Sequence, residues 1–87
     1  MNKYIFYLRP PTKQTKRISL VYFSVFTAAS LQQAARAFSD FYRVDYCGFL
    51  QLSQQKAEVY FVKIQQKKQI ELVYVVIEER MVRDRQI

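Results

Sequence analysis

The strands expected in this chain are apolar on both faces, yet the sequence offers a single helix to cover them. Successive side chains of a strand point to opposite faces of its sheet. One side of segment 17–26 carries Ile18, Leu20, Tyr22 and Phe26, and the other carries Val21, Phe23 and Val25. Segment 69–78 carries Ile70, Leu72, Tyr74 and Val76 on one side and Val73, Val75 and Ile77 on the other. A sheet that buries one face alternates apolar with polar residues. The pattern therefore indicates a binding or assembly module, and either face fits as the one that the helix covers.

Hydrophobic periodicity predicts six elements in the order β-β-α-β-β-β. The strands are expected at residues 3–9, 17–26, 44–52, 57–65 and 69–78, and the helix between 27–31 and 41–42. A helical crossover would make the second and third strands parallel, and hairpins would make the other neighbours antiparallel. We expect a single α+β domain over residues 1–78, with a mixed, mostly antiparallel sheet and one helix packed on one face. Residues 79–87 read as a charged C-terminal tail.

Two local signals sharpen this description. Ser30 and Gln33 have the spacing of a capping box, in which the two side chains bond free backbone N–H groups at a helix start. Gly48 lies inside a predicted strand and indicates a β-bulge. Cys47 is expected to be a small buried residue of that strand.

The chain carries 14 Lys and Arg against 7 Asp and Glu, a formal net charge of +7. This excess favours an anionic partner, either nucleic acid or an acidic protein surface, although charge by itself also serves solubility. In the expected topology the first loop and the turn at 66–68 lie at the same end of the sheet. Eight basic residues would then form a positive rim: Arg9, Lys13, Lys16, Arg17, Arg43, Lys63, Lys67 and Lys68.

Seven tyrosines are interleaved with these basic residues. Aromatic rings on a sheet stack unpaired bases while lysine and arginine neutralise phosphates. The structural interpretation is that tyrosine favours β-strands, where its ring is half-buried and its hydroxyl contacts water. The predicted nucleic-acid contacts are Arg9, Lys13, Lys16, Arg17, Lys67 and Lys68 for phosphates, and Tyr22, Tyr60 and Tyr74 for bases.

Residues that carry catalysis or hold metals are scarce. The sequence has no histidine, one cysteine and one glycine, so we expect no metal site, no glycine-rich phosphate loop and no cofactor. The serines lack a base to activate them, and Glu78 and Glu79 would point to opposite faces of a strand. We therefore expect a protein that is not an enzyme.

The second sheet face has three possible covers. It can pack against a second copy in a homodimer, curl into a half-barrel, or serve as a platform for a partner. No apolar run is long enough to span a bilayer, and no signal peptide is recognisable, so we expect a cytoplasmic protein without a membrane partner.

The leading hypothesis is a small non-catalytic module that binds an anionic partner, most simply nucleic acid, through the basic rim. The alternative is a protein-interaction module, such as a regulator, an inhibitor or an assembly subunit of phage or mobile-element type. That module would act through an apolar sheet face or an edge strand.

Overall fold

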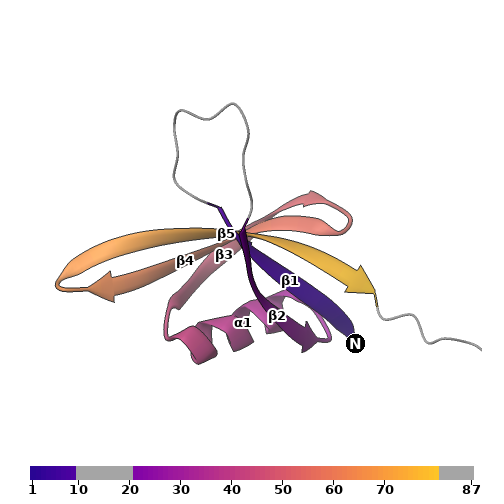
Figure 1. Cartoon of the computed structure of the whole chain (residues 1–87), viewed down its shortest axis with the longest axis horizontal. Coiled ribbons are helices and arrows are strands. Elements are labelled where there is room, and N and C mark those ends of the chain that lie inside the picture. Colours follow the sequence, from indigo (N-terminus) through magenta and orange to yellow (C-terminus); the bar gives the residue numbers. More distant parts are fainter. Residues whose placement is uncertain (10–20, 81–87) are drawn as a thin grey trace, which may run out of the picture.

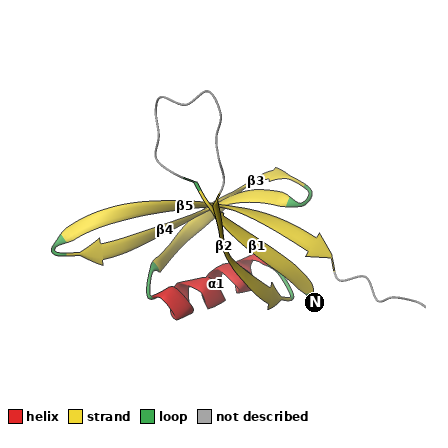
Figure 2. Cartoon of the chain, viewed as in Figure 1, coloured by secondary structure: helices red, strands yellow, loops and turns green. Residues whose placement is uncertain are grey.

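The computed structural model describes residues 1–9 and 21–80. Five strands form one open sheet, and a single helix packs on one of its faces (Figures 1 and 2). The elements are β1 (Asn2–Leu8), β2 (Val21–Ala28), α1 (Leu31–Tyr42), β3 (Asp45–Ser53), β4 (Lys56–Gln65) and β5 (Lys68–Arg80). Figure 1 looks along the sheet, so the strands cross near one point and fan out through the right-handed twist expected of strands.

The spatial order of the strands is β2-β1-β5-β4-β3, and every neighbouring pair is antiparallel. The α+β class, the order β-β-α-β-β-β and the single covering helix are confirmed. The expected parallel pair is wrong, so the sheet is antiparallel throughout rather than mixed. The helix does join two strands of the same direction, but β2 and β3 lie at opposite edges, because β1, β5 and β4 separate them.

Element ends lie close to their expected positions. β2 continues to Ala28, two residues beyond its predicted end, while its predicted start at residue 17 lies outside the described residues. β5 continues to Arg80. Glu79 and Arg80 therefore belong to the sheet and not to a tail, and residues 81–87 lie outside the described residues.

The helix begins at the predicted capping box. The hydroxyl of Ser30 accepts a hydrogen bond from the Gln33 N–H at 3.2 Å, and the Gln33 side chain accepts one from the Ala29 N–H at 3.2 Å. The helix ends at Arg43, whose left-handed conformation (φ 57°, ψ 51°) lets its own N–H and the Val44 N–H bond the carbonyl of Ser39. Both ends of the helix thus satisfy backbone groups that the helix itself leaves free.

The core lies between the helix and one sheet face. Phe38 is its centre: the Phe38 ring lies 4.5 Å from Phe6, 4.7 Å from Phe61 and 4.8 Å from Tyr74, centroid to centroid. The small side chains Ala34 and Ala35 are fully buried and let the helix approach the strands closely. The covered face is therefore the one that carries the even-numbered residues of β1 and β5.

Both edge strands are irregular. The β3–β4 register shifts between Tyr46 and Gly48, and Gly48 has φ 136°, so the predicted bulge is confirmed. Cys47 lies in this bulge and is exposed, which corrects the expectation of a buried thiol. A second bulge in β2 leaves Phe23 without a partner in β1 and turns its ring inward, 5.0 Å from the ring of Tyr42.

The opposite face of the sheet is apolar at its centre but is not widely exposed. Val75 is buried, and Ile5, Tyr7 and Ile77 around it are half-buried. The most exposed apolar side chains of β2 and β3 are instead Val21 and Tyr22 at one edge, and Leu50 and Leu52 at the other. Both edge strands thus carry exposed apolar side chains, and Phe41 of the helix and Ile64 of the β4–β5 hairpin are more exposed still.

Candidate nucleic-acid interface

The β4–β5 hairpin extends beyond its neighbours as a free two-stranded ribbon. The last β4 residue paired with β3 is Val62, and the first β5 residue paired with β1 is Tyr74. Residues 63–70, which we call the ribbon, pair only with each other, and Figure 1 shows this hairpin projecting away from the helix and the other strands.

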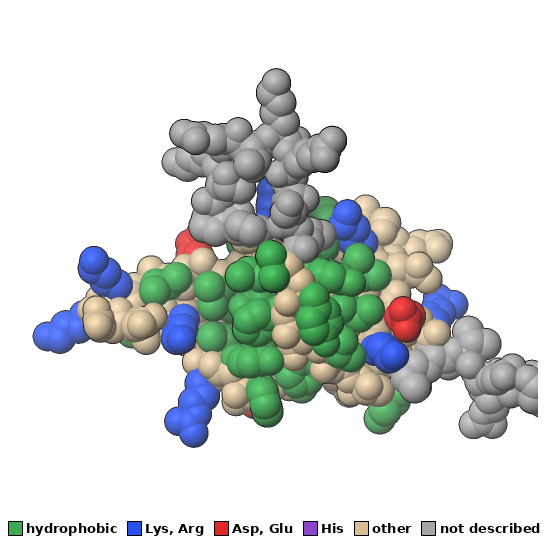
Figure 3. Space-filling view, viewed as in Figure 1, with side chains coloured by type: hydrophobic (Ala, Val, Ile, Leu, Met, Phe, Trp, Pro, Cys, Tyr) green, Lys and Arg blue, Asp and Glu red, His purple; other side chains and the backbone are tan. Residues whose placement is uncertain are grey.

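The ribbon is basic. Lys63, Lys67 and Lys68 are all exposed, and the sequence has no acidic residue between Glu58 and Glu71. The ion pairs of residues 1–9 and 21–80 involve Lys3 and Arg9 only, so no acid in that part of the chain neutralises the ribbon lysines. Figure 3 shows lysine and arginine side chains at the end of the β4–β5 hairpin, away from the apolar middle of the view.

A tight turn presents two of these lysines. Gln65 pairs with Lys68, and the two residues between them, Gln66 and Lys67, have φ 52° and φ 65°. Positive φ at both central residues is the mark of a type I′ turn, whose twist matches that of the flanking strands. The turn therefore continues the twist of the two strands to the tip of the ribbon, where Lys67 and Lys68 are adjacent.

Arg9 lies at the same end of the sheet but not beside the ribbon tip. Its N–H bonds the carbonyl of Val73 at 3.2 Å. Val73 is five residues along β5 from Lys68, which at roughly 3.3 Å per residue is about 17 Å. The guanidinium of Arg9 forms an ion pair with Glu58, which is half-buried on the sheet face that the helix does not cover. The described part of the predicted rim is therefore divided, and Arg9 shares its charge with an acid.

Glu58 also holds Tyr60. The Tyr60 hydroxyl donates a hydrogen bond to the second Glu58 oxygen at 2.7 Å. That hydrogen bond, followed by desolvation and the charge of Glu58, raises the pKa of Tyr60 above its ordinary value of 10.0, against a smaller lowering effect of Arg9. The three side chains form one connected polar group that joins Arg9, which follows β1, to Glu58 and Tyr60 of β4.

The three predicted tyrosines occupy different environments. Tyr22 is 60% exposed at the β2 edge, with its ring 6.3 Å from Tyr7, and Tyr60 is half-buried on the uncovered face. Tyr74 is only 4% exposed and packs against Phe38 and Phe61. Its expected role in contacting bases is corrected, because the helix covers the face on which its ring lies.

Lys13, Lys16 and Arg17 lie outside the described residues. The residue that sequence reasoning left out of the phosphate set is Lys63, which belongs to the ribbon. The signal for it was the acid-free stretch between Glu58 and Glu71, which covers the whole ribbon and contains three lysines.

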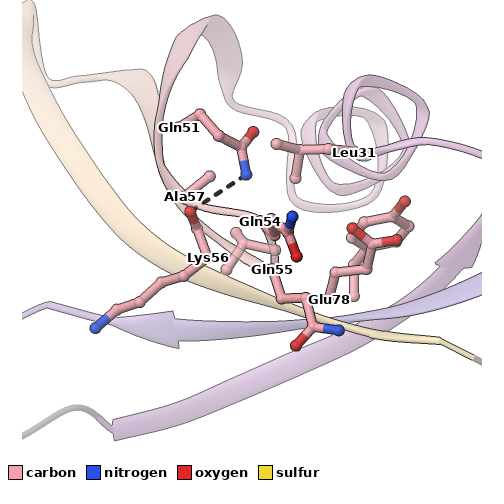
Figure 4. A pocket seen from close by; sticks show the side chains of 9 residues that line it. Leu31, Gln51, Gln54, Gln55, Lys56, Ala57 and Glu78 are labelled. Carbon is pink, nitrogen blue, oxygen red and sulfur yellow. Dashed lines mark hydrogen bonds between the residues drawn. The ribbon is translucent and has the colours of Figure 1, made fainter.

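A small hollow of about 160 Å³ lies near the start of the helix, between Leu31 and the β3–β4 turn (Figure 4). Two of its polar side chains, Gln51 and Glu78, have protein partners. The Gln51 amide donates to the carbonyls of Ser53 at 2.6 Å and Lys56 at 3.3 Å, and Glu78 accepts from Asn2 at 2.5 Å. The Gln51 bonds close the β3–β4 turn, and none of these contacts joins a nucleophile to a base.

Residues 1–9 and 21–80 contain no group of three His, Cys, Asp or Glu placed to hold a metal ion. Their single helix lacks the length and apolar character needed to cross a membrane.

Comparison of the chain with protein-family models, curated proteins and solved structures found no match.

Proposed function

We propose that this protein binds duplex nucleic acid by inserting the ribbon into a groove. The observation that supports this most directly is the projecting two-stranded ribbon, which carries Lys63, Lys67 and Lys68 and no acid. Ammonium groups that replace the counterions of phosphates supply sequence-independent affinity.

The shape of the ribbon favours DNA over RNA as the duplex. The B-DNA major groove, about 12 Å wide, admits a two-stranded β-ribbon. The major groove of an A-form RNA helix is too deep and narrow for side chains to read. A ribbon free on both edges suits the wider groove.

The remaining ribbon side chains suit base edges. Gln65, Gln66 and Gln69 carry amides, which pair with the adenine edge in the major groove. Ile64, 70% exposed, offers an apolar contact of the kind that a thymine methyl group accepts. Lys13, Lys16 and Arg17 stay in the proposal as phosphate contacts on sequence alone, and Arg9 is the weaker candidate because it pairs with Glu58.

The test is binding of a labelled DNA duplex across a salt series. Wild-type affinity should fall linearly on a log–log plot as salt rises. A Lys67→Glu/Lys68→Glu variant should bind more weakly and lose about two from that slope, at about 0.9 per phosphate contact. The control, Arg36→Glu/Arg80→Glu, changes the net charge equally at two exposed residues away from the ribbon and should keep most of the affinity and the slope.

Equal losses in the two variants would reduce the effect to net charge and contradict the ribbon. Absence of wild-type binding at low salt would contradict the proposal as a whole. Preference for single strands over duplex would move the interaction from the ribbon to the exposed tyrosines.

The second candidate function, a protein-interaction module, is favoured by the exposed apolar side chains of the two edge strands. Edge strands accept a further strand through their free backbone groups.

A further inference from the structure

β2 is one of the two edge strands of the sheet formed by the described residues. β2 pairs with β1 on one side only, so its other side presents free backbone N–H and C=O groups. Its exposed apolar side chains are Val21 (53%), Tyr22 (60%), Phe23 (39%) and Val25 (37%). Apolar side chains flank the unpaired backbone on both faces of the strand.

This edge has little of the usual protection against pairing, namely one β-bulge at Phe23 and no charged residue or proline. Natural edge strands carry lysine, proline or inward-pointing charges that discourage a further strand. Residues 21–35 contain no charged residue and no proline, although the chain carries a net charge of +7. The opposite edge differs, because β3 starts with Asp45 and its pairing with β4 is interrupted by two register shifts. β2 has one register shift and no charged residue, so it is the less protected of the two edges.

The helix extends the same apolar surface. The hydroxyl of Tyr42 donates a hydrogen bond to the Ser24 hydroxyl at 3.0 Å, which holds the end of α1 over β2. Next to it, Phe41 is 71% exposed, and its ring lies edge-on to Phe26 at 6.0 Å. A strand added to β2 would therefore lie in reach of a phenylalanine from the helix.

We propose that β2 pairs with β2 of a second copy of this chain, antiparallel, to form a two-fold symmetric dimer. The occupant must be a strand that is apolar on both faces and uncharged where it meets β2. A second copy meets each condition by symmetry, because β2 itself carries no charged residue. This interface goes beyond the proposed nucleic-acid binding and uses none of the ribbon residues.

Symmetry fixes the form of the dimer. Antiparallel edge-to-edge pairing requires a two-fold axis perpendicular to the sheet, because an axis along the strands would make them parallel. The result is a continuous ten-stranded sheet with both helices on the same face. Phe41 of each copy lies over the joint, and the two ribbons point in opposite directions.

The experiment is light scattering of the full chain at several concentrations in about 0.15 M salt, which screens long-range repulsion. The wild type should have about twice the mass of one 10.5 kDa chain. Val25→Lys places a charge on the β2 edge, and Thr27→Lys does the same at a position that is already polar. Each variant should reduce the mass of the particle to that of one chain. Leu52→Lys places the same charge at an exposed apolar position of β3 and should leave the dimer intact.

Far-UV circular dichroism of each variant checks that it is folded. Hydrogen exchange on the unaltered protein gives an independent readout, since protection of the Val21–Ala28 amides should rise with concentration. A wild type that is monomeric at every concentration overturns the proposal. So does a dimer that Leu52→Lys splits while both β2 variants keep it, or a particle larger than a dimer.

Discussion

Tyr60 lies next to charged side chains on the sheet face that the helix does not cover, and these charges change its pKa. Its hydroxyl donates to Glu58, which is also the ion-pair partner of Arg9. A negative acceptor favours the protonated phenol, so the pKa of Tyr60 is raised. Burial raises the pKa of Tyr46 and of Tyr74 as well.

These directions predict alkaline destabilisation. Well below pH 10.0 Tyr60 keeps its proton in both the folded and the unfolded chain, and its contribution to stability is fully present. As pH rises through the raised pKa, the unfolded chain releases its proton first and that contribution is lost. Urea unfolding between about pH 9 and pH 11 should show stability falling more steeply in wild type than in Tyr60→Phe.

Glu58→Gln is the matched variant, because it keeps the phenol and removes the negative acceptor. Tyrosinate absorbance should show an ionisation at lower pH in Glu58→Gln than in wild type. Identical titrations in the two proteins would show that Glu58 does not act on Tyr60.

For single residues, the sequence indicates which side chains could form a site, but it does not indicate how buried each of them is. Tyr22, Tyr60 and Tyr74 look alike in the sequence, since all three lie in apolar strands that alternate poorly. Their environments depend on which face the helix covers, and a strand that is apolar on both faces contains no sign of that choice. The Phe23 bulge, which changes the phase of β2, leaves no glycine as a marker.

The β4–β5 turn is the element with a visible mismatch between sequence and conformation. Gln66 and Lys67 both have positive φ, a conformation that asparagine and glycine adopt more readily. Left-handed backbone costs an ordinary L-residue roughly 1–2 kcal/mol. The ribbon therefore stores a small local strain at its tip.

Replacing Gln66 with asparagine should relieve part of that strain. We expect Gln66→Asn to raise the free energy of unfolding by about 0.5–1 kcal/mol, measured by urea denaturation, without changing any charge. Gln54→Asn in the β3–β4 turn is the control, because Gln54 is not among the described residues with positive φ. A gain of the same size at Gln54 would refute the explanation by left-handed backbone.

The elements themselves were largely predictable. The capping box, Gly48 and the apolar runs mark the helix and strands to within a few residues. The turn geometry was not predictable, because the sequence lacks the Asn-Gly signature of a type I′ hairpin. Nor could the sequence reveal that the β4–β5 hairpin extends beyond β1 and β3. The ribbon begins where those two strands stop pairing with the hairpin.

Across the whole molecule, aromatic rings connect the helix to four of the five strands. Phe38 lies within 6 Å, centroid to centroid, of rings from β1, β2, β4 and β5. In a domain this small a single buried ring represents a large share of the core.

Phe38→Ala should therefore cost about 3–5 kcal/mol, enough to remove much of the stability of a small domain. Thermal unfolding followed by circular dichroism should show a lost or strongly lowered transition. Ile64→Ala, at a ribbon position that is 70% exposed, should stay within about 0.5 kcal/mol of wild type. Comparable melting temperatures for the two variants would contradict this description of the core.

The strand order was the part of the fold least accessible from sequence. Hairpins predict which consecutive strands pair, but the insertion of β5 between β1 and β4 is a long-range choice. The one available sign was the apolar run 72–77, the most continuous in the chain, which is typical of a central strand.

The insertion of β5 also has a kinetic consequence. The β4–β5 hairpin is local and can form within microseconds, whereas the β1–β5 ladder joins residues as far apart in the sequence as Asn2 and Arg80. The entropy of closing that loop is lost before the ladder compensates for it, so folding is limited by the meeting of the two ends. Until they meet, β1 and β2 form a lone apolar hairpin with both outer edges unpaired, and the unfinished chain is most prone to aggregate there.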